Sequence, residues 1–173
     1  MALEPVEIAE QGKHAFEEKR YGIAAELFNQ AAEGFSADRD GLMAAEMKNN
    51  MSVALLRAGK SQEALDTALG TDEYFAGAKD LKRQAMALGN QAAALEALGR
   101  LDEAMEKYDL SAELFGRVGE GDLRAMVKKS SATINLKKGR IFDSAYNMLG
   151  ALDSKETPST FERILKFFLR LIK

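Results

Sequence analysis

The segment Leu95-Glu96-Ala97-Leu98-Gly99-Arg100-Leu101-Asp102-Glu103-Ala104 decides the fold, because it predicts the end of one helix, a tight turn and the start of a second helix. Glycine directly after a helix can adopt the left-handed conformation that closes the helix C-terminus. The turn glycine at position 99 recurs forty residues earlier as Gly59 and forty residues later as Gly139. A fixed period of this length is typical of proteins built from repeated helix pairs.

Residues that are forty positions apart share their character along the chain. Three sets show it: the small residues Ala24, Ala64, Ala104 and Ser144, the small residues Gly12, Ser52, Ala92 and Ala132, and the aromatic residues Phe35, Phe75 and Phe115. Small residues allow two helices to approach closely, and large side chains fill the spaces between neighbouring helix pairs. Because one helix pair does not bury its apolar face alone, we expect the pairs to stack.

The composition favours an all-α protein. Alanine, leucine, glutamate, lysine and methionine, which are good helix formers, dominate, and the two prolines, Pro5 and Pro158, stand near the ends of the sequence. The period predicts helices at about 5–18 and 21–36, 41–58 and 61–76, 80–98 and 101–117, and 121–138 and 141–153. Gly70 falls inside the expected helix 61–76, where glycine is unfavourable.

This pattern resembles the tetratricopeptide repeat over roughly residues 5–153. Residues 1–40 match best, through Gly12, Ala15, Tyr21, Ala24, Phe28 and Ala31, and residues 81–120 match through Leu88, Ala92, Leu95, Gly99, Ala104, Tyr108 and Ser111. The period of 40 resembles the longer-helix branch of the family, as in kinesin light chains and several bacterial regulators. The resemblance implies a right-handed α-solenoid of four antiparallel helix hairpins over 1–157, with repeats at about 1–40, 41–80, 81–120 and 121–157. The residues that follow, 158–173, predict a C-terminal amphipathic helix on their own pattern.

The resemblance also implies a concave groove lined by the first helix of each pair. Its predicted peptide-binding residues are Lys13, Asn49, Asn50, Arg57, Met86, Asn90, Met126, Lys129 and Lys137. In the resembled family, the position of Asn50 and Asn90 often holds the backbone of a bound peptide, since an amide both donates and accepts hydrogen bonds. The alternatives are that these amides satisfy polar groups between helices and that the methionines belong to the core. We expect a non-catalytic adaptor for a protein or peptide, with a weak preference for acidic ligands.

Catalysis, metal binding and nucleic-acid binding are not expected. His14 is the only histidine and there is no cysteine, so the chain offers neither a usual metal-ligand set nor a nucleophile with its base. A net charge of −3 argues against nucleic acid, which requires a basic surface. We expect no cofactor. Without an export signal or an apolar run long enough to span a bilayer, a cytoplasmic protein is expected.

The C-terminal segment departs from the repeat. Ser159 and Glu162 form a capping-box pattern, and a strongly apolar helix is expected to follow. Its expected interaction residues are Phe161, Ile164, Leu165, Phe168 and Ile172. The helix could cap the last hairpin, could be buried by self-association or in the groove, or could lie on a membrane surface with its basic residues at the headgroups. The alternative function is therefore a self-assembling or membrane-peripheral scaffold, which deletion of 159–173 tests by solution mass and by co-sedimentation with anionic liposomes.

Overall fold

The computed structural model describes residues 3–135, which form eight α-helices and no strand. The helices are α1 (Pro5–Glu17), α2 (Tyr21–Ala37), α3 (Gly41–Arg57), α4 (Ser61–Ala68), α5 (Thr71–Gly77), α6 (Leu81–Ala97), α7 (Leu101–Arg117) and α8 (Gly121–Asn135). Residues 1–131 form one compact unit, and the last turn of α8 belongs to a second unit. The expected all-α class is confirmed for the described residues.

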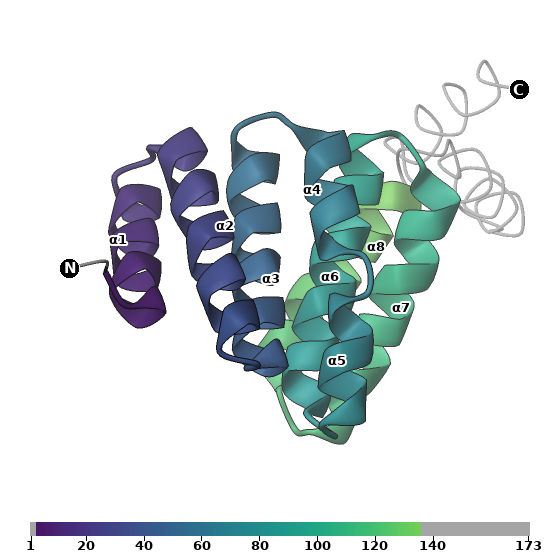
Figure 1. Ribbon diagram of the computed structural model, residues 1–173. Coiled ribbons are helices and arrows are strands. Elements are labelled where there is room, and N and C mark those ends of the chain that lie inside the picture. Colours follow the sequence, from purple (N-terminus) through teal and green to yellow (C-terminus); the bar gives the residue numbers. More distant parts are fainter. Residues whose placement is uncertain (1–2, 136–173) are drawn as a thin grey trace, which may run out of the picture. The chain divides into compact units, whose positions relative to one another are not determined.

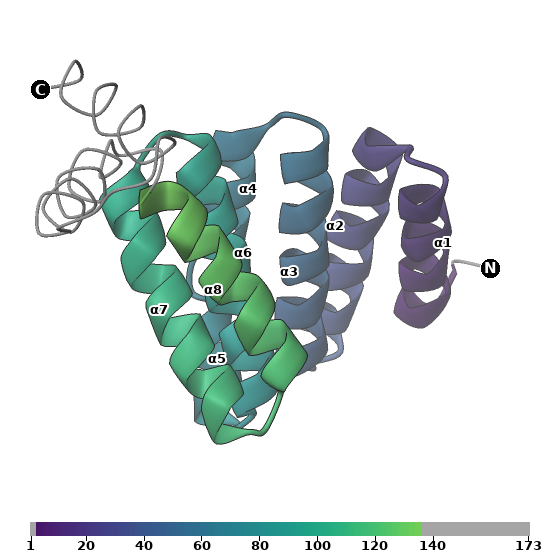
Figure 2. The ribbon, with the colours of Figure 1, turned by 180° about the vertical axis from the view of Figure 1, so that it is seen from behind.

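Helices that follow one another in sequence pack against each other in the first unit. This holds for α1 with α2, α2 with α3, α3 with α4, α5 with α6 and α6 with α7. Figures 1 and 2 show α1, α2 and α3 side by side from opposite directions. Both α4 and α5 pack on α6, which also contacts α3. The α3 and α6 helices therefore contact each other, although the two short helices α4 and α5 separate them in the sequence.

Small residues lie at the closest helix contacts, as the forty-residue pattern predicts. Ala24, Ala64 and Ala104 are fully buried, with no exposed surface. At Gly12, a Cβ atom would lie 2.9 Å from the ring of Phe28, so that a larger residue would displace the ring. The aromatic positions are buried too, at 7% exposure for Phe35, 0% for Phe75 and 3% for Phe115.

The turns repeat every twenty residues, which is half of the period read from the sequence. A left-handed residue with positive φ occurs at Lys19, Arg39, Gly59, Lys79, Gly99 and Gly119. In each turn the next amide donates to the carbonyl five residues back, as from Arg100 to Leu95 at 3.0 Å. The turns between helix pairs therefore have the same geometry as the turns within them, and three of the six positions carry a basic residue instead of glycine.

The prediction of one helix over 61–76 is wrong. The helix ends at Ala68, Leu69 is extended with ψ of 133°, and Gly70 has φ of 80°, which is the left-handed region. A helix cannot continue through such a residue, so the chain restarts at Thr71 as α5. The other described helix bounds lie within one residue of those expected, except for the end of α8, where the description itself stops at residue 135.

Several predictions fall outside the described residues. They concern the helix expected at 141–153, the tail at 158–173 with Phe161, Ile164, Leu165, Phe168 and Ile172, and the groove residue Lys137. Within residues 3–135, no helix is both long enough and apolar enough to cross a membrane.

Candidate functional site

Three pockets adjoin one another along the first unit, and we call them together the groove. The first, of about 380 Å³, shares Glu46 and Asn50 with the second, of about 360 Å³. The third, of about 590 Å³, shares Met86 with the second and Val53 with the first. Most lining residues come from α1, α3, α6 and α8, which are the helices that the sequence predicted to line a groove.

Buried aromatic side chains from the other helices form the floor of the groove. The α2 residue Phe28 lines the first pocket, the α5 residue Phe75 lines the second, and the α7 residues Tyr108 and Phe115 line the third. All four are at most 5% exposed. From the sequence, large aromatic residues were expected only to fill the spaces between helix pairs, whereas in the structure these four also line the pockets of the groove.

The first pocket combines charge with apolar surface. Lys13 is 2.6 Å from the carboxylate of Glu10, one turn earlier on α1. Phe16, Phe28 and Val53 supply the apolar walls. The positive charge of Lys13 is thus largely compensated within its own helix.

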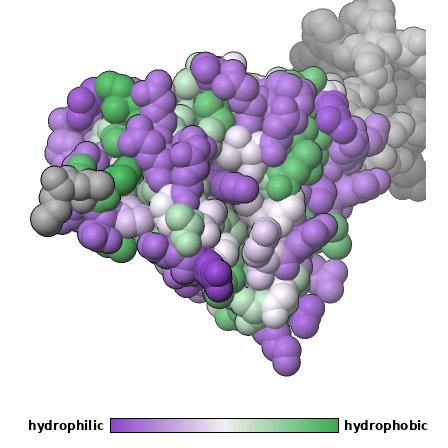
Figure 3. Space-filling model, viewed as in Figure 1, coloured by the Kyte–Doolittle hydropathy of each residue, from purple (hydrophilic) through white to green (hydrophobic). Residues whose placement is uncertain are grey.

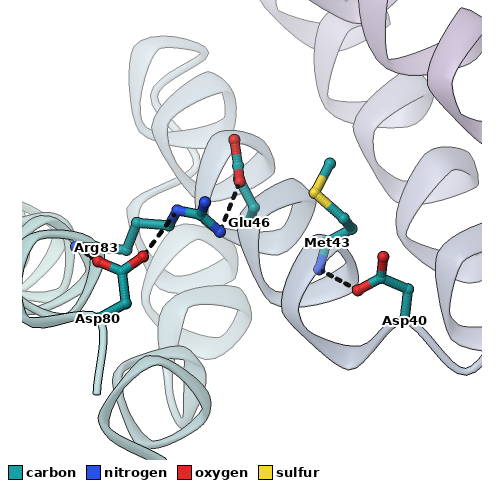
Figure 4. A network of polar contacts seen from close by, with 5 residues as sticks. All are labelled: Asp40, Met43, Glu46, Asp80 and Arg83. Atoms are coloured by element: carbon teal, nitrogen blue, oxygen red, sulfur yellow. Dashed lines mark hydrogen bonds and ion pairs between the residues drawn. The ribbon is translucent and has the colours of Figure 1, made fainter. Parts of the chain in front are cut away.

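The second pocket contains a network of ion pairs between α3 and α6 (Figure 4). The guanidinium of Arg83 lies 3.3 Å from Glu46 on α3 and 3.2 Å from Asp80. Asp80 also caps α6, because its carboxylate accepts a hydrogen bond from the Arg83 amide at 2.9 Å. The equivalent cap forty residues earlier is Asp40, which accepts from the Met43 amide at 3.0 Å. Because Met43 stands at the position equivalent to Arg83, the earlier cap has no guanidinium that could form an ion pair with another helix.

Arg83 was not among the predicted groove residues. The sequence could have indicated it through the Asp-x-x-Arg spacing at the start of a helix. An acidic residue, Glu46, also lies on the first helix of the preceding repeat. The guanidinium also lies 6.0 Å from the centre of the Phe75 ring. Lys82, in the same pocket, is 2.5 Å from Glu120. Both cations of the second pocket are therefore paired within the protein.

The third pocket is the largest of the three and is mainly apolar. Its walls include Val53, Leu56, Met86, Ala93, Leu123 and Met126. Met86 is 45% exposed and Met126 is 61% exposed, so both side chains lie at the surface of the groove and outside the core. Arg57 is the only charged residue among those that line this pocket.

Tyr108, which lines the third pocket, forms a hydrogen bond with an acidic residue. Its hydroxyl donates a hydrogen bond to the Glu96 carboxylate at 3.1 Å. Burial, followed by the negative charge of Glu96, raises the pKa of Tyr108 to about 12, and a hydrogen bond with Ser130 opposes this shift. The hydroxyl therefore stays protonated at neutral pH and remains able to donate this hydrogen bond.

The three predicted asparagines have different surroundings. Asn49 is 6% exposed and accepts a hydrogen bond from the Asn90 amide at 3.0 Å, which links α3 to α6. The alternative that an asparagine satisfies polar groups between helices thus describes this pair. Asn50 is half-buried and lines both the first and second pockets. No hydrogen bond occupies its side chain among the described residues.

The remaining predicted residues are placed as follows. Lys129 is exposed on α8 and does not line these three pockets. Lys13, Arg57, Met86, Asn90 and Met126 all line the groove. Within residues 3–135, no group of three or more histidine, aspartate or glutamate side chains is arranged to hold a metal ion.

In the view of Figure 3 the surface is largely hydrophilic, and apolar side chains occur only in small separate patches. In the view from behind, α8 lies toward the viewer, whereas α5 lies toward the viewer in Figure 1 (Figure 2). The adjoining, partly apolar pockets make the groove the best candidate site in the described part of the chain.

Comparison with known proteins adds no assignment. No model of a known protein family matches the sequence, and a search of curated proteins finds no match. The candidate site therefore depends on the chain's own residues and geometry.

Proposed function

We propose that this protein is a tetratricopeptide-like adaptor without catalytic activity, which binds an extended segment of a partner protein in the groove. In this proposal the chain is a solenoid of four antiparallel helix hairpins, and the first helix of each hairpin faces the bound segment. The observation that carries the proposal is the set of three pockets with shared walls, lined mainly by α1, α3, α6 and α8. A row of adjoining pockets suits a chain that places successive side chains into them.

Asn50 is the residue that we assign to the partner's backbone. It lies where the first and second pockets meet, so its amide can reach a segment that passes from one to the other. Asn90, which was predicted for the same role, already donates to Asn49. A free side-chain amide can donate to a peptide carbonyl and accept from a peptide amide at once, which holds the backbone without specifying its sequence.

The test is quantitative recovery of partners by the full-length protein and by the variant Asn50→Ala. Loss of one or two hydrogen bonds at a partly buried site costs roughly 1–2 kcal/mol, so we expect recovery to fall about tenfold. The matched control is Asn29→Ala on α2, where the exposed asparagine donates a hydrogen bond to Glu33 at 2.8 Å and lies outside the groove. Equal recovery of the same partners by Asn50→Ala and by the wild-type protein would remove Asn50 from the site.

A further inference from the structure

Arg57 differs from the other positively charged residues that line the groove because it has no ion-pair partner among the described residues. Lys13, Lys82 and Arg83 each form an ion pair within the protein. Arg57 is exposed at the end of α3, and no described residue forms an ion pair or hydrogen bond with it. The groove thus presents one uncompensated positive charge at the edge of its largest pocket.

The surroundings of Arg57 favour an apolar side chain next to the charge. The pocket of about 590 Å³ has Met86 and Met126 at its surface and the rings of Tyr108 and Phe115 among its lining. Methionine side chains are flexible and adapt to apolar ligands of different shapes.

We infer that the third pocket recognises an acidic peptide segment in which a carboxylate lies beside a large apolar side chain. The carboxylate pairs with Arg57, whose planar guanidinium can bind both oxygens, and the apolar side chain enters the pocket between Met86 and Met126. This inference rests on the proposed groove function and adds the chemical class of the partner. Charge complementarity to a single unpaired guanidinium is the observation that selects this occupant.

The experiment selects peptides from a random phage-displayed library with the full-length protein and measures each selected peptide by fluorescence polarisation. The protein variants are Arg57→Glu, Met86→Glu and the control Lys48→Glu, which makes the same charge change on α3 at an exposed position outside the groove. Each peptide is also made with its acidic residue replaced by lysine. Binding is repeated at high salt, which screens an exposed ion pair.

Selected peptides are expected to carry aspartate or glutamate within one or two positions of leucine, methionine or phenylalanine. Arg57→Glu should weaken their binding about tenfold, because it replaces an attraction by a repulsion, and Lys48→Glu should change it less than about twofold. The lysine-substituted peptide should bind Arg57→Glu better than it binds the wild-type protein.

Two different failures can be distinguished. Peptides that lose affinity with Met86→Glu but show no acidic residue and no response to Arg57→Glu would overturn the partner class and leave the groove function standing. Recovery of no peptide, or of peptides that bind all the variants equally well, would overturn both the partner class and the groove function.

Discussion

The α4–α5 pair and the α7 helix are the equivalent second halves of two successive forty-residue repeats, but only α7 is a continuous helix. It runs unbroken over Leu101–Arg117, whereas the equivalent 61–77 is divided between Ser61–Ala68 and Thr71–Gly77. Both nevertheless bury equivalent residues at their two ends, Ala64 and Phe75 in one and Ala104 and Phe115 in the other. The register of the repeat is therefore kept by buried side chains, and it survives the loss of helical hydrogen bonds in the middle.

The break is accommodated by side chains that replace the lost backbone bonds. The carbonyl of Ala68 accepts a hydrogen bond from the Thr71 hydroxyl at 2.7 Å and another from the Gln91 amide at 3.0 Å. Gln91, which is fully buried on α6, also donates to Asp72 at 2.7 Å. A buried carbonyl without a partner is unfavourable, so these bonds make the break compatible with a packed core. In α7 the equivalent of Thr71 is Ser111, which instead donates to the Ala85 carbonyl on α6 at 2.7 Å.

The largest effect is expected from Phe75→Ala. Phe75 is the main apolar anchor of a helix of only seven residues, and it packs with Ala45 and Ala87 in the core. Removal of a fully buried phenylalanine side chain costs about 3–5 kcal/mol, and we expect this loss in urea unfolding followed by circular dichroism. Tyr74→Ala, at a residue of the same helix that is 60% exposed, should cost less than about 1 kcal/mol. If the two substitutions cost the same, Phe75 does not anchor α5.

A smaller loss is expected from Gly70→Ala. A Cβ atom at position 70 would meet no atom within 4 Å, so the cost comes from the φ of 80° alone. The left-handed conformation is unfavourable for alanine by roughly 1–2 kcal/mol, and the melting temperature should fall accordingly. Gly77→Ala in α5 also meets no atom within 4 Å, and its φ is not positive, so it should leave stability unchanged or raise it by up to about 1 kcal/mol. Equal effects at the two glycines would show that Gly70 does not impose the break.

The sequence predicted the helices well because the small residues at their contacts have a fixed spacing that does not depend on tertiary structure. It did not reveal the break, since a single glycine, Gly70, within a helical pattern does not by itself end a helix. The bonds of Gln91 that accommodate the break join residues 19 and 23 positions apart. For the site, the resemblance to the tetratricopeptide repeat implied that Asn50, Arg57 and Met86 lie on lining helices, and all three line the pockets of the groove. Which charges are compensated could not be predicted, because the pairing of Arg83 with Glu46 and of Lys82 with Glu120 depends on the distance between different helices.

The smallest effect, and the one of opposite sign, is expected at the turns that lack glycine. Lys19 and Lys79 have φ of 61° and 60° at positions equivalent to Gly59, Gly99 and Gly119 in the twenty-residue pattern of turns. Glycine adopts this conformation without the steric penalty of a Cβ atom, so Lys19→Gly and Lys79→Gly should each raise the unfolding free energy by about 0.5–1 kcal/mol. Lys48→Gly, the same substitution inside α3, should lower it by about 1 kcal/mol, since glycine is a poor helix former. A loss of stability at Lys19 or Lys79 would instead mean that the lysine side chain itself holds the turn, and that the basic turns differ from the glycine turns in kind.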